Sequence, residues 1–317
     1  MNIRNFFRHP VVSVLIASLM ILELILVMNP PNALVFKLGV DNAVRVMLFY
    51  LFLGFFFMLV GQNKLLFLSF TCCAVLCSFL KNRTDGIPEQ TSLVENSSPT
   101  FSMAHFSAAN INEGHQEALA MILETDPDLV SVQELSPIWA SWLEEKLEGR
   151  YPYSFELPDV DIFGLALYSK IPFEKIDTFH YRNIPILKGT IRVDKNHLVE
   201  LLSIQTYPAL SQLDYERIKE HLELAVEETK DDKLPMLVFG QFQLVPWSNE
   251  ILKFREELQL QDSRKGLLSA YPSGSLSLLN IPFDHIFHTK DIQCLYFATI
   301  NSEETKQLGI IGTYQLK

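Results

Sequence analysis

Three apolar runs near the start of the chain constrain its fold more than any other feature of the sequence. They cover residues 11–28, 44–60 and 65–80. A helix needs roughly 20 apolar residues, within a range of about 17–25, to cross the hydrocarbon core of a bilayer. No polar residues recur along these runs at the spacing that gives a helix of a soluble protein its solvated face. We therefore expect residues 1–80 to form three transmembrane helices, which would make the chain an integral membrane protein.

Charged residues in and around these runs bear on their placement in the membrane. Glu23 lies inside the first run, where a charge is costly, so we expect it to face the other helices or to lie near an interface. Arg4 and Arg8 precede this run and favour a cytoplasmic N-terminus, so that three crossings put the remainder of the chain on the outer side. A cleaved signal peptide is the alternative for the first run, but residues 29–32, Asn-Pro-Pro-Asn, offer no small-residue cleavage site.

The rest of the chain is acidic. The net charge is −11, and Glu23 and Asp41 are the only acids before residue 81, so the negative charge belongs to the later residues. Non-specific binding to nucleic acids depends on basic contacts to phosphates, which an acidic domain repels at long range. The charge therefore argues against nucleic acid as a partner, and the sequence identifies no protein partner.

The chain after the apolar runs has two parts. Residues 81–102 form a polar stretch with Ser, Asn and Pro and no periodicity, which predicts a linker. In residues 103–317 short apolar strands alternate with amphipathic helices, which predicts an α/β domain built as a two-sheet sandwich flanked by helices. The expected strands cover residues 105–111, 129–132, 163–168, 189–193, 198–206, 236–239, 286–288, 292–299 and 308–315, and the expected helices cover residues 113–124, 137–147, 213–229 and 248–258.

Short motifs in this second part occur in a characteristic order. They are FSAANIN (106–112), DPDLVSVQEL (126–135), YPYSF (151–155), GLALYSKIP (164–172), LVFGQFQLVPWS (237–248) and IPFDHIF (281–287). In order and spacing these motifs resemble the endonuclease/exonuclease/phosphatase superfamily, and most of all its bacterial membrane-anchored branch with three N-terminal helices. The resemblance implies Mg²⁺-dependent hydrolysis of a phosphate ester. It also implies a protein of the bacterial inner membrane. The positive charges before the first apolar run then favour the periplasmic side for its soluble domain.

The same resemblance assigns roles to polar residues at strand ends. It implies that Glu134 binds Mg²⁺ with Asn110 beside it, because these ligands hold the ion that neutralises charge developing on the phosphoester. Asn112 and Gln205 fall at positions that would contact a phosphate-containing substrate. The two asparagines have a structural alternative as turn residues that cap the following helix.

The sequence departs from the family pattern at several catalytic positions. The family's Gly-Asp-Phe-Asn reads Gly-Gln-Phe-Gln here, so Gln241 and Gln243 occupy the replaced positions. An amide cannot take a proton from water at neutral pH, and the extra methylene of Gln243 misplaces its donor. Gln205 replaces the family's central histidine. The terminal Ser-Asp-His is missing from the tail, where Thr313 and Tyr314 stand at or near its positions.

Asp284 and His285 remain as candidate catalytic residues, although Asp284 lacks the terminal histidine that it orients in the family. The alternative for these two residues is a buried hydrogen-bonded pair without a catalytic role. Taken together, the replacements predict a membrane-anchored domain with impaired catalysis, a pseudoenzyme with a binding or scaffolding role. The competing hypothesis is an active Mg²⁺-dependent phosphoesterase or phosphodiesterase, to which Asp159 or Asp161 could supply a substitute carboxylate.

Overall fold

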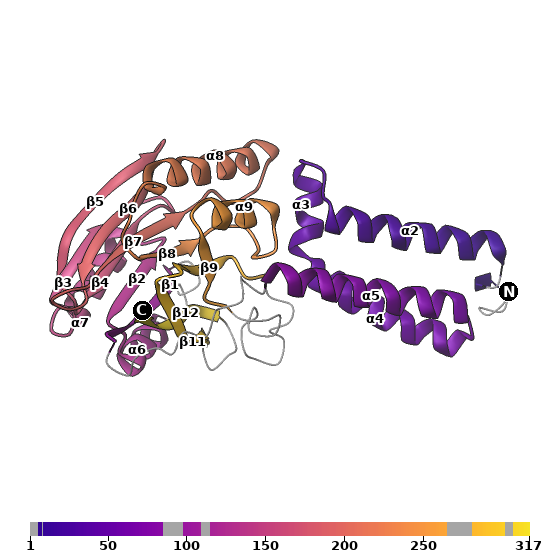
Figure 1. Cartoon of the computed structure of the whole chain (residues 1–317), viewed down its shortest axis with the longest axis horizontal. Coiled ribbons are helices and arrows are strands. Elements are labelled where there is room, and N and C mark those ends of the chain that lie inside the picture. Colours follow the sequence, from indigo (N-terminus) through magenta and orange to yellow (C-terminus); the bar gives the residue numbers. More distant parts are fainter. Residues whose placement is uncertain (1–5, 8, 85–97, 109–114, 265–280, 302–306) are drawn as a thin grey trace. The chain divides into compact units, whose positions relative to one another are not determined.

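The computed structural model describes residues 6–7, 9–84, 98–108, 115–264, 281–301 and 307–317. The chain divides into two compact units, Met1–Thr84 and Asp85–Lys317 (Figure 1). The last helix of the first unit runs to Thr84 and the first strand of the second begins at Thr100, so the segment between them is shorter at both ends than residues 81–102.

The first unit is helical in its described residues. Its helices are α2 (Pro10–Met28), α3 (Leu34–Asp41), α4 (Ala43–Val60) and α5 (Asn63–Thr84). Helices α2, α4 and α5 are long and apolar enough to cross a membrane, which confirms the three helices expected from the apolar runs. The short helix α3 was not expected from the sequence. It carries an ion pair between Lys37 Nζ and Asp41 Oδ2 at 2.5 Å, one helical turn apart.

Three local features hold α2, α4 and α5 together. Gly61 adopts a left-handed φ of 74° after α4, and α5 begins two residues later, which gives the tight helical hairpin. At Gly54 an added Cβ would lie 2.7 Å from the Phe70 ring, so the glycine allows α4 and α5 to approach closely. The Tyr50 hydroxyl donates to Glu23 Oε2 at 3.0 Å, which confirms that Glu23 faces another helix.

The second unit contains two six-stranded sheets. Sheet A has the strand order β11-β12-β1-β2-β4-β3, and sheet B has the order β5-β6-β7-β8-β10-β9. The pairs β1–β2 and β7–β8 are parallel and the other neighbours are antiparallel. The strands are β1 (Thr100–Ser107), β2 (Leu129–Gln133), β3 (Tyr153–Leu157), β4 (Leu165–Ser169), β5 (Phe173–Tyr181), β6 (Ile184–Arg192), β7 (Leu198–Gln205), β8 (Met236–Gln241), β9 (Leu260–Asp262), β10 (Asp284–Thr289), β11 (Ile292–Asn301) and β12 (Gln307–Leu316).

Helices connect the parallel strands and cover the sheets (Figure 1). Helix α6 (His115–Thr125) joins β1 to β2, and α8 (Gln212–Thr229) joins β7 to β8. Helix α7 (Pro137–Leu147) starts at the expected proline, and α9 (Asn249–Glu257) starts after Ser248, whose side chain accepts from the Ile251 N–H as expected of an N-cap. The two-sheet α/β sandwich flanked by helices predicted from the sequence is therefore confirmed.

Side chains that point alternately to the two faces of each strand produce two apolar cores. On β1, Phe101 and Met103 face the space between the sheets, where they join residues of β7, β8 and β12. Ala104 and Phe106 face the other way and pack with α6 and α7. Side chains two apart share a face of a strand, so each strand supplies one row to each layer.

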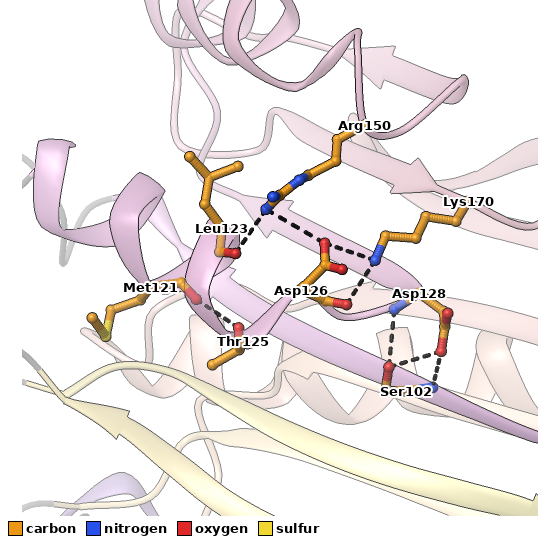
Figure 2. Close-up of polar contacts among 8 residues, drawn as sticks. All are labelled: Ser102, Met121, Leu123, Thr125, Asp126, Asp128, Arg150 and Lys170. Carbon is orange, nitrogen blue, oxygen red and sulfur yellow. Dashed lines mark hydrogen bonds and ion pairs between the residues drawn. The ribbon is translucent and has the colours of Figure 1, made fainter.

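Polar contacts fix sheet A at the edge where β1 and β2 begin (Figure 2). Asp126 has a left-handed φ of 45°, and Lys170 Nζ lies 2.8 Å from its Oδ1 and donates to its carbonyl oxygen at 2.7 Å. The hydrogen bond from Lys170 holds the pKa of Asp126 below its ordinary value. The N–H and hydroxyl of Ser102 donate to Asp128 Oδ2 at 2.7 and 2.8 Å. These contacts set where β2 starts, and therefore which of its residues lie at its far end.

The first strand differs from its expected range, 105–111. It begins at Thr100, because residues from Thr100 to Phe106 pair with Gln315 to Gly309 of β12, a partner distant in the sequence. The strands β3, β5 and β9 were not expected. In β5, exposed charged residues such as Glu174 and Asp177 interrupt the apolar pattern, because this strand has only one neighbour in its sheet.

Candidate functional site

Polar side chains gather where the inward-facing rows of both sheets end. The row on β2 runs Leu129, Ser131, Gln133, and the row on β8 runs Leu237, Phe239, Gln241. The rows on β1, β7 and β10 end at the same edge in Ser107, Gln205 and Asp284, because β1 pairs in parallel with β2, β7 in parallel with β8, and β10 antiparallel to β8. The candidate site therefore arises from strand alternation combined with parallel pairing.

Gln133 links the two sheets at this edge. Its Nε2 donates to Ser203 Oγ at 3.0 Å and to the Ile204 carbonyl oxygen at 3.1 Å, and its Oε1 accepts from the Gln241 N–H at 2.8 Å. Gly240 makes this approach possible. It has φ 136°, and an added Cβ would lie 2.0 Å from the Ile204 carbonyl oxygen and 2.7 Å from Gln133 Nε2. Sequence analysis gave Gln133 no role beyond its place in the motif of residues 126–135. The hydrogen-bond distances show that its side chain joins the two sheets.

Glu134 projects from the turn after β2. Its backbone adopts φ 59°, a left-handed conformation that bends the chain out of the strand. The Ser107 hydroxyl at the end of β1 donates to Glu134 Oε2 at 2.9 Å. The carboxylate lines a surface pocket of about 440 Å³, whose other lining residues are Ser136, Trp139, Val160, Asp161, Ile162 and Phe163. Ser107 and Asp161 thus lie at this site. Sequence analysis gave Ser107 no role and named Asp161 only as a possible substitute carboxylate.

The replaced positions lie on the sheet B side of the same edge. Gln241 ends β8 and is half-buried, and Gln243 is half-buried in the following turn with φ 54°. Gln205 is buried at the end of β7, and its Nε2 donates to the Ile162 carbonyl oxygen at 2.5 Å. The side chain of Gln205 therefore holds the loop that forms one wall of the Glu134 pocket. Its Oε1 is buried without a hydrogen-bond partner among the described residues.

Asp284 and His285 point to opposite faces of β10. Asp284 shares the inward face with Ile286 and lies opposite Gln241 in the register. Burial raises the pKa of the Asp284 carboxyl to about 6, while the Arg264 guanidinium opposes the rise and the Glu134 carboxylate adds to it. The influence of Glu134 indicates that these two acids share one end of the sandwich.

His285 belongs to the layer beneath α9. Its ring stacks on Phe287 with centroids 5.1 Å apart, and its Nε2 lies 2.8 Å from the Leu244 carbonyl oxygen. Since a carbonyl oxygen only accepts, Nε2 carries the proton. Burial lowers the pKa of His285 far below its ordinary value, so the ring stays neutral. The structure brings Asp284 to the candidate site and places His285 in the packing on the other side of the sheet.

Two further sets of residues named from the sequence remain. Asn110 and Asn112 fall outside the described residues. Thr313 and Tyr314 pair with Ser102 and Phe101, at the start of β1 and away from Ser107. Tyr314 is buried there and lies 2.9 Å from the Ser263 hydroxyl. Thr313 and Tyr314 therefore lie at the opposite end of β1 from the edge that carries Glu134.

Mg²⁺ takes oxygen ligands in near-octahedral geometry, and in proteins one or two carboxylates usually hold it together with waters or substrate phosphates. Among the described residues, no three His, Cys, Asp or Glu side chains come close enough to hold a metal ion. Glu134 offers one carboxylate, and Asp284 is buried with a raised pKa. Gln241 and Gln243 could offer only neutral amide oxygens. Of the two ligands that the resemblance implied, Glu134 is at this edge and Asn110 lies outside the described residues.

Known structures share the fold of the second unit. An endonuclease/exonuclease/phosphatase from Beutenbergia cavernae is 16% identical with a TM-score of 0.58, covering 69% of this chain and 72% of its own. A humanized D. rerio TDP2 is 13% identical with a TM-score of 0.55, covering 68% and 99%. The human Nocturnin catalytic domain, solved with a bound sulfate anion, is 14% identical with a TM-score of 0.50, covering 69% and 96%.

The sequence matches no curated protein. It does match the Endonuclease/Exonuclease/phosphatase family over residues 106–302, a range that begins within β1 and includes Glu134, Gln241 and Asp284. Since this range covers more than half of the chain and the two-sheet fold agrees with it, the chain belongs to the endonuclease/exonuclease/phosphatase family.

Proposed function

We propose that this protein is a membrane-anchored member of the family whose hydrolytic chemistry is impaired and whose second unit has a binding or scaffolding role. The observation that carries the proposal is the chemistry at the shared strand edge. The groups gathered there with Glu134 are the hydroxyl of Ser107, the amides of Gln133, Gln205 and Gln241, and the buried carboxyl of Asp284. Amides and hydroxyls can bind and orient a ligand, but they cannot act as a base at neutral pH.

Hydrolysis of a phosphoester needs groups that this edge lacks among the described residues. Water must be activated by a base, and the developing charge must be stabilised by a cation or a proton donor. Gln241 replaces the expected carboxylate, and His285 is buried on the other side of β10. Loss of such a group costs about 10²–10⁴-fold in rate in other enzymes, and the losses are not additive.

An active Mg²⁺-dependent phosphoesterase is the second candidate, and one observation favours it. Asp161 lines the same pocket as Glu134, so two carboxylates border one cavity. Because both are acidic, an anionic phosphate would enter this pocket only together with a cation. Nucleic acid is disfavoured as the phosphate ligand, because no Lys or Arg is among the described residues that line the pocket.

The proposed setting is the inner membrane of a bacterium, with the second unit on the periplasmic side. Helices α2, α4 and α5 support a membrane location by their length and composition. Arg4 and Arg8, which precede α2, support a cytoplasmic N-terminus.

A test of the proposed function compares the full chain with Glu134→Gln and Asp161→Asn in detergent. Binding of Mg²⁺ and Mn²⁺ is measured by calorimetry, and turnover is measured on bis(p-nitrophenyl) phosphate with each ion. We expect no turnover above that of Glu134→Gln, because Gln241 replaces the carboxylate of the family motif and His285 lies on the other side of β10. Metal-dependent turnover that disappears in both variants would refute the impaired-enzyme proposal and establish the phosphoesterase.

A gain-of-function variant checks that the scaffold itself is intact. In Gln241→Asp with Gln243→Asn the carboxylate and the shorter amide return to the end of β8. We expect this variant to bind Mg²⁺ more tightly than the natural chain, because a further carboxylate then lies at the edge that carries Glu134. Unchanged metal binding in a folded variant would indicate that the edge does not form a metal site even with the family residues.

A further inference from the structure

Three apolar side chains of the second unit are unusually exposed. Val160, Ile138 and Leu210 are 88, 84 and 83% exposed, more than any other large apolar side chain in the described part of the chain, including those of the candidate membrane helices. A single exposed apolar residue is common on a soluble domain and needs no explanation. Several such residues around one pocket indicate an interaction surface.

The exposed residues lie on loops at the edge that carries Glu134. Val160 is in the loop 158–164, and its neighbour Ile162 is also exposed. Ile138 is in the first turn of α7, directly after the Glu134 turn, and Leu210 is in the loop between β7 and α8. We call Ile138, Val160, Ile162 and Leu210 the apolar rim.

Contacts between these loops hold the apolar rim in place. In the loop 158–164, the Asp159 N–H donates to the Leu135 carbonyl oxygen at 3.0 Å. The Phe163 ring contacts the Tyr207 ring with centroids 5.2 Å apart, which ties this loop to the one that carries Leu210. The rim is therefore a supported surface, and its exposed side chains are presented on a packed base.

The apolar rim borders the pocket already described, and Leu210 is linked to it through the contact of Tyr207 with Phe163, which lines the pocket. Val160 and Ile162 line that pocket together with Glu134, and Ser136 and Trp139, on either side of Ile138, line it as well. Whatever covers the rim therefore also covers the pocket.

The lipid bilayer is the binding partner of the apolar rim that the chain itself holds close to the second unit. The same chain carries three helices long and apolar enough to span a membrane. Residues 85–99 connect α5 to β1, and at about 3.3–3.6 Å per residue such a segment extends to at most about 50 Å. Tethering raises the effective concentration of the bilayer at the domain, so a few apolar side chains suffice for docking that a free domain could not sustain.

The charges on the loops of the apolar rim indicate which kind of lipid surface the rim can bind. The loop 158–164 carries Asp159 and Asp161 and no Lys or Arg, and residues 206–211 carry no charge. Arg217 lies over the Tyr207 ring but is paired with Asp214 at 3.2 Å, so these described loops offer anionic lipids no unpaired cation, and apolar insertion must supply the affinity. This pattern favours a zwitterionic surface over an anionic one.

We propose that the apolar rim inserts into the interfacial region of the bilayer, so that the Glu134 pocket opens onto lipid. A protein partner could also cover apolar side chains, but the tether keeps the bilayer permanently within reach. This docking does not depend on whether the pocket hydrolyses its ligand, because insertion requires no catalytic group.

The test places an environment-sensitive fluorophore on the full chain in nanodiscs of phosphatidylcholine. Single labels are attached through Val160→Cys or Leu210→Cys after the four natural cysteines are replaced by alanine. The matched control is Lys290→Cys, an exposed position in the turn after β10, at the opposite end of that strand from Asp284. Lipids with a nitroxide on the acyl chain serve as quenchers.

We expect the labels at 160 and 210 to emit at shorter wavelength and to be quenched by the nitroxide lipid, while the label at 290 behaves as in water. Water-like, unquenched emission at 160 and 210 overturns the proposal and leaves the rim to a protein partner. Equal quenching at all three positions overturns it as well, because it shows contact without a preferred edge.

A second variant tests whether the rim side chains themselves cause the docking. Ile138→Ser with Val160→Ser, read out by the label at Leu210→Cys, is expected to lose most of the quenching. Both side chains are exposed, so the melting temperature should stay the same and serves as the folding control. Full quenching in a folded double variant would contradict the role of the rim. In nanodiscs that contain anionic phosphatidylglycerol, the quenching of the original labels should be weaker.

Discussion

Burial determines the charge of several histidines in the second unit. It lowers the pKa of His105 and of His221 from 6.5 to about 3. His105 lies between the sheets, 3.1 Å from Ser131 Oγ, and the ring of His221 on α8 stacks on Tyr181 with centroids 4.9 Å apart. These rings are neutral parts of the packing. Their exclusion from catalysis follows from burial, which the sequence shows only indirectly.

The neutral state of His221 predicts how stability depends on pH. The folded state binds no proton at this ring above about pH 3, whereas the unfolded chain binds one below about pH 6.5. Unfolding free energy is therefore lost as the pH falls from about 6.5 toward 3, by about 1.4 kcal/mol per pH unit for each such histidine. His221→Phe keeps the stacking on Tyr181 and removes this contribution.

The measurement for His221→Phe is denaturant unfolding of the full chain in detergent at pH 7.5, 5.5 and 4.5. We expect the free energy of unfolding of the variant to fall less steeply with decreasing pH than that of the natural chain. The difference in slope should be about 1.4 kcal/mol per pH unit, the contribution of one buried histidine. Parallel pH profiles for the two proteins would show that His221 is protonated in the folded state, contrary to its burial.

At the scale of secondary-structure elements, the ends of the strands form the candidate site, whereas their middles form the apolar packing. The middle of β8 is apolar packing, whereas its end carries Gly240 and Gln241. The hydrogen bonds of Gln133 join this end to β2 and β7, so the two sheets are fixed to one another at the candidate site. A change here should affect both the stability of the sandwich and the site.

Gly240→Ala tests this junction. The added Cβ would lie 2.0 Å from the Ile204 carbonyl oxygen, and φ 136° disfavours any side chain. We expect a loss of about 3 kcal/mol or more in the free energy of unfolding, because backbone strain and a steric clash act together. The matched control is Gly149→Ala, where an added Cβ meets nothing within 4 Å and a change within about 0.5 kcal/mol is expected. Similar losses in both variants would contradict the steric argument.

At the scale of the whole molecule, the second unit contains what a separate domain needs. Its sheets enclose their own apolar core, and its first and last strands are paired with each other. The chain just before β1 takes part in this pairing, because the Leu316 N–H donates to the Pro99 carbonyl oxygen at 3.1 Å and Gln315 Nε2 donates to the Ser98 carbonyl oxygen at 3.3 Å.

A chain that begins at residue 98 is therefore expected to fold in water without the first unit. We expect a single cooperative thermal transition followed by circular dichroism, because the described core is complete without residues 1–84. A chain that begins at residue 103 is the informative comparison. It lacks Phe101 of the inter-sheet core and the pairing of residues 100–102, and it should be less stable. An aggregated or non-cooperative product from residue 98 would show that the first unit is required for folding.

The sequence by itself determined three apolar helices, an acidic two-sheet domain and a Gln-Glu turn whose carboxylate lies at a strand edge. Each of these depends on local periodicity or on adjacent residues, which a sequence displays directly. Helix starts at Pro137 and Ser248 could be predicted for the same reason, because a cap acts within one turn.

Only the tertiary structure decided which polar residues share a site. It brought Ser107, Gln205 and Asp161 to the neighbourhood of Glu134, and it placed Tyr314 at the other end of β1. The physical reason is that strand register and pairing between distant segments determine which side chains meet, and neither is encoded in the spacing of neighbouring residues. A site built from the ends of many strands is therefore visible only after the strands have been paired.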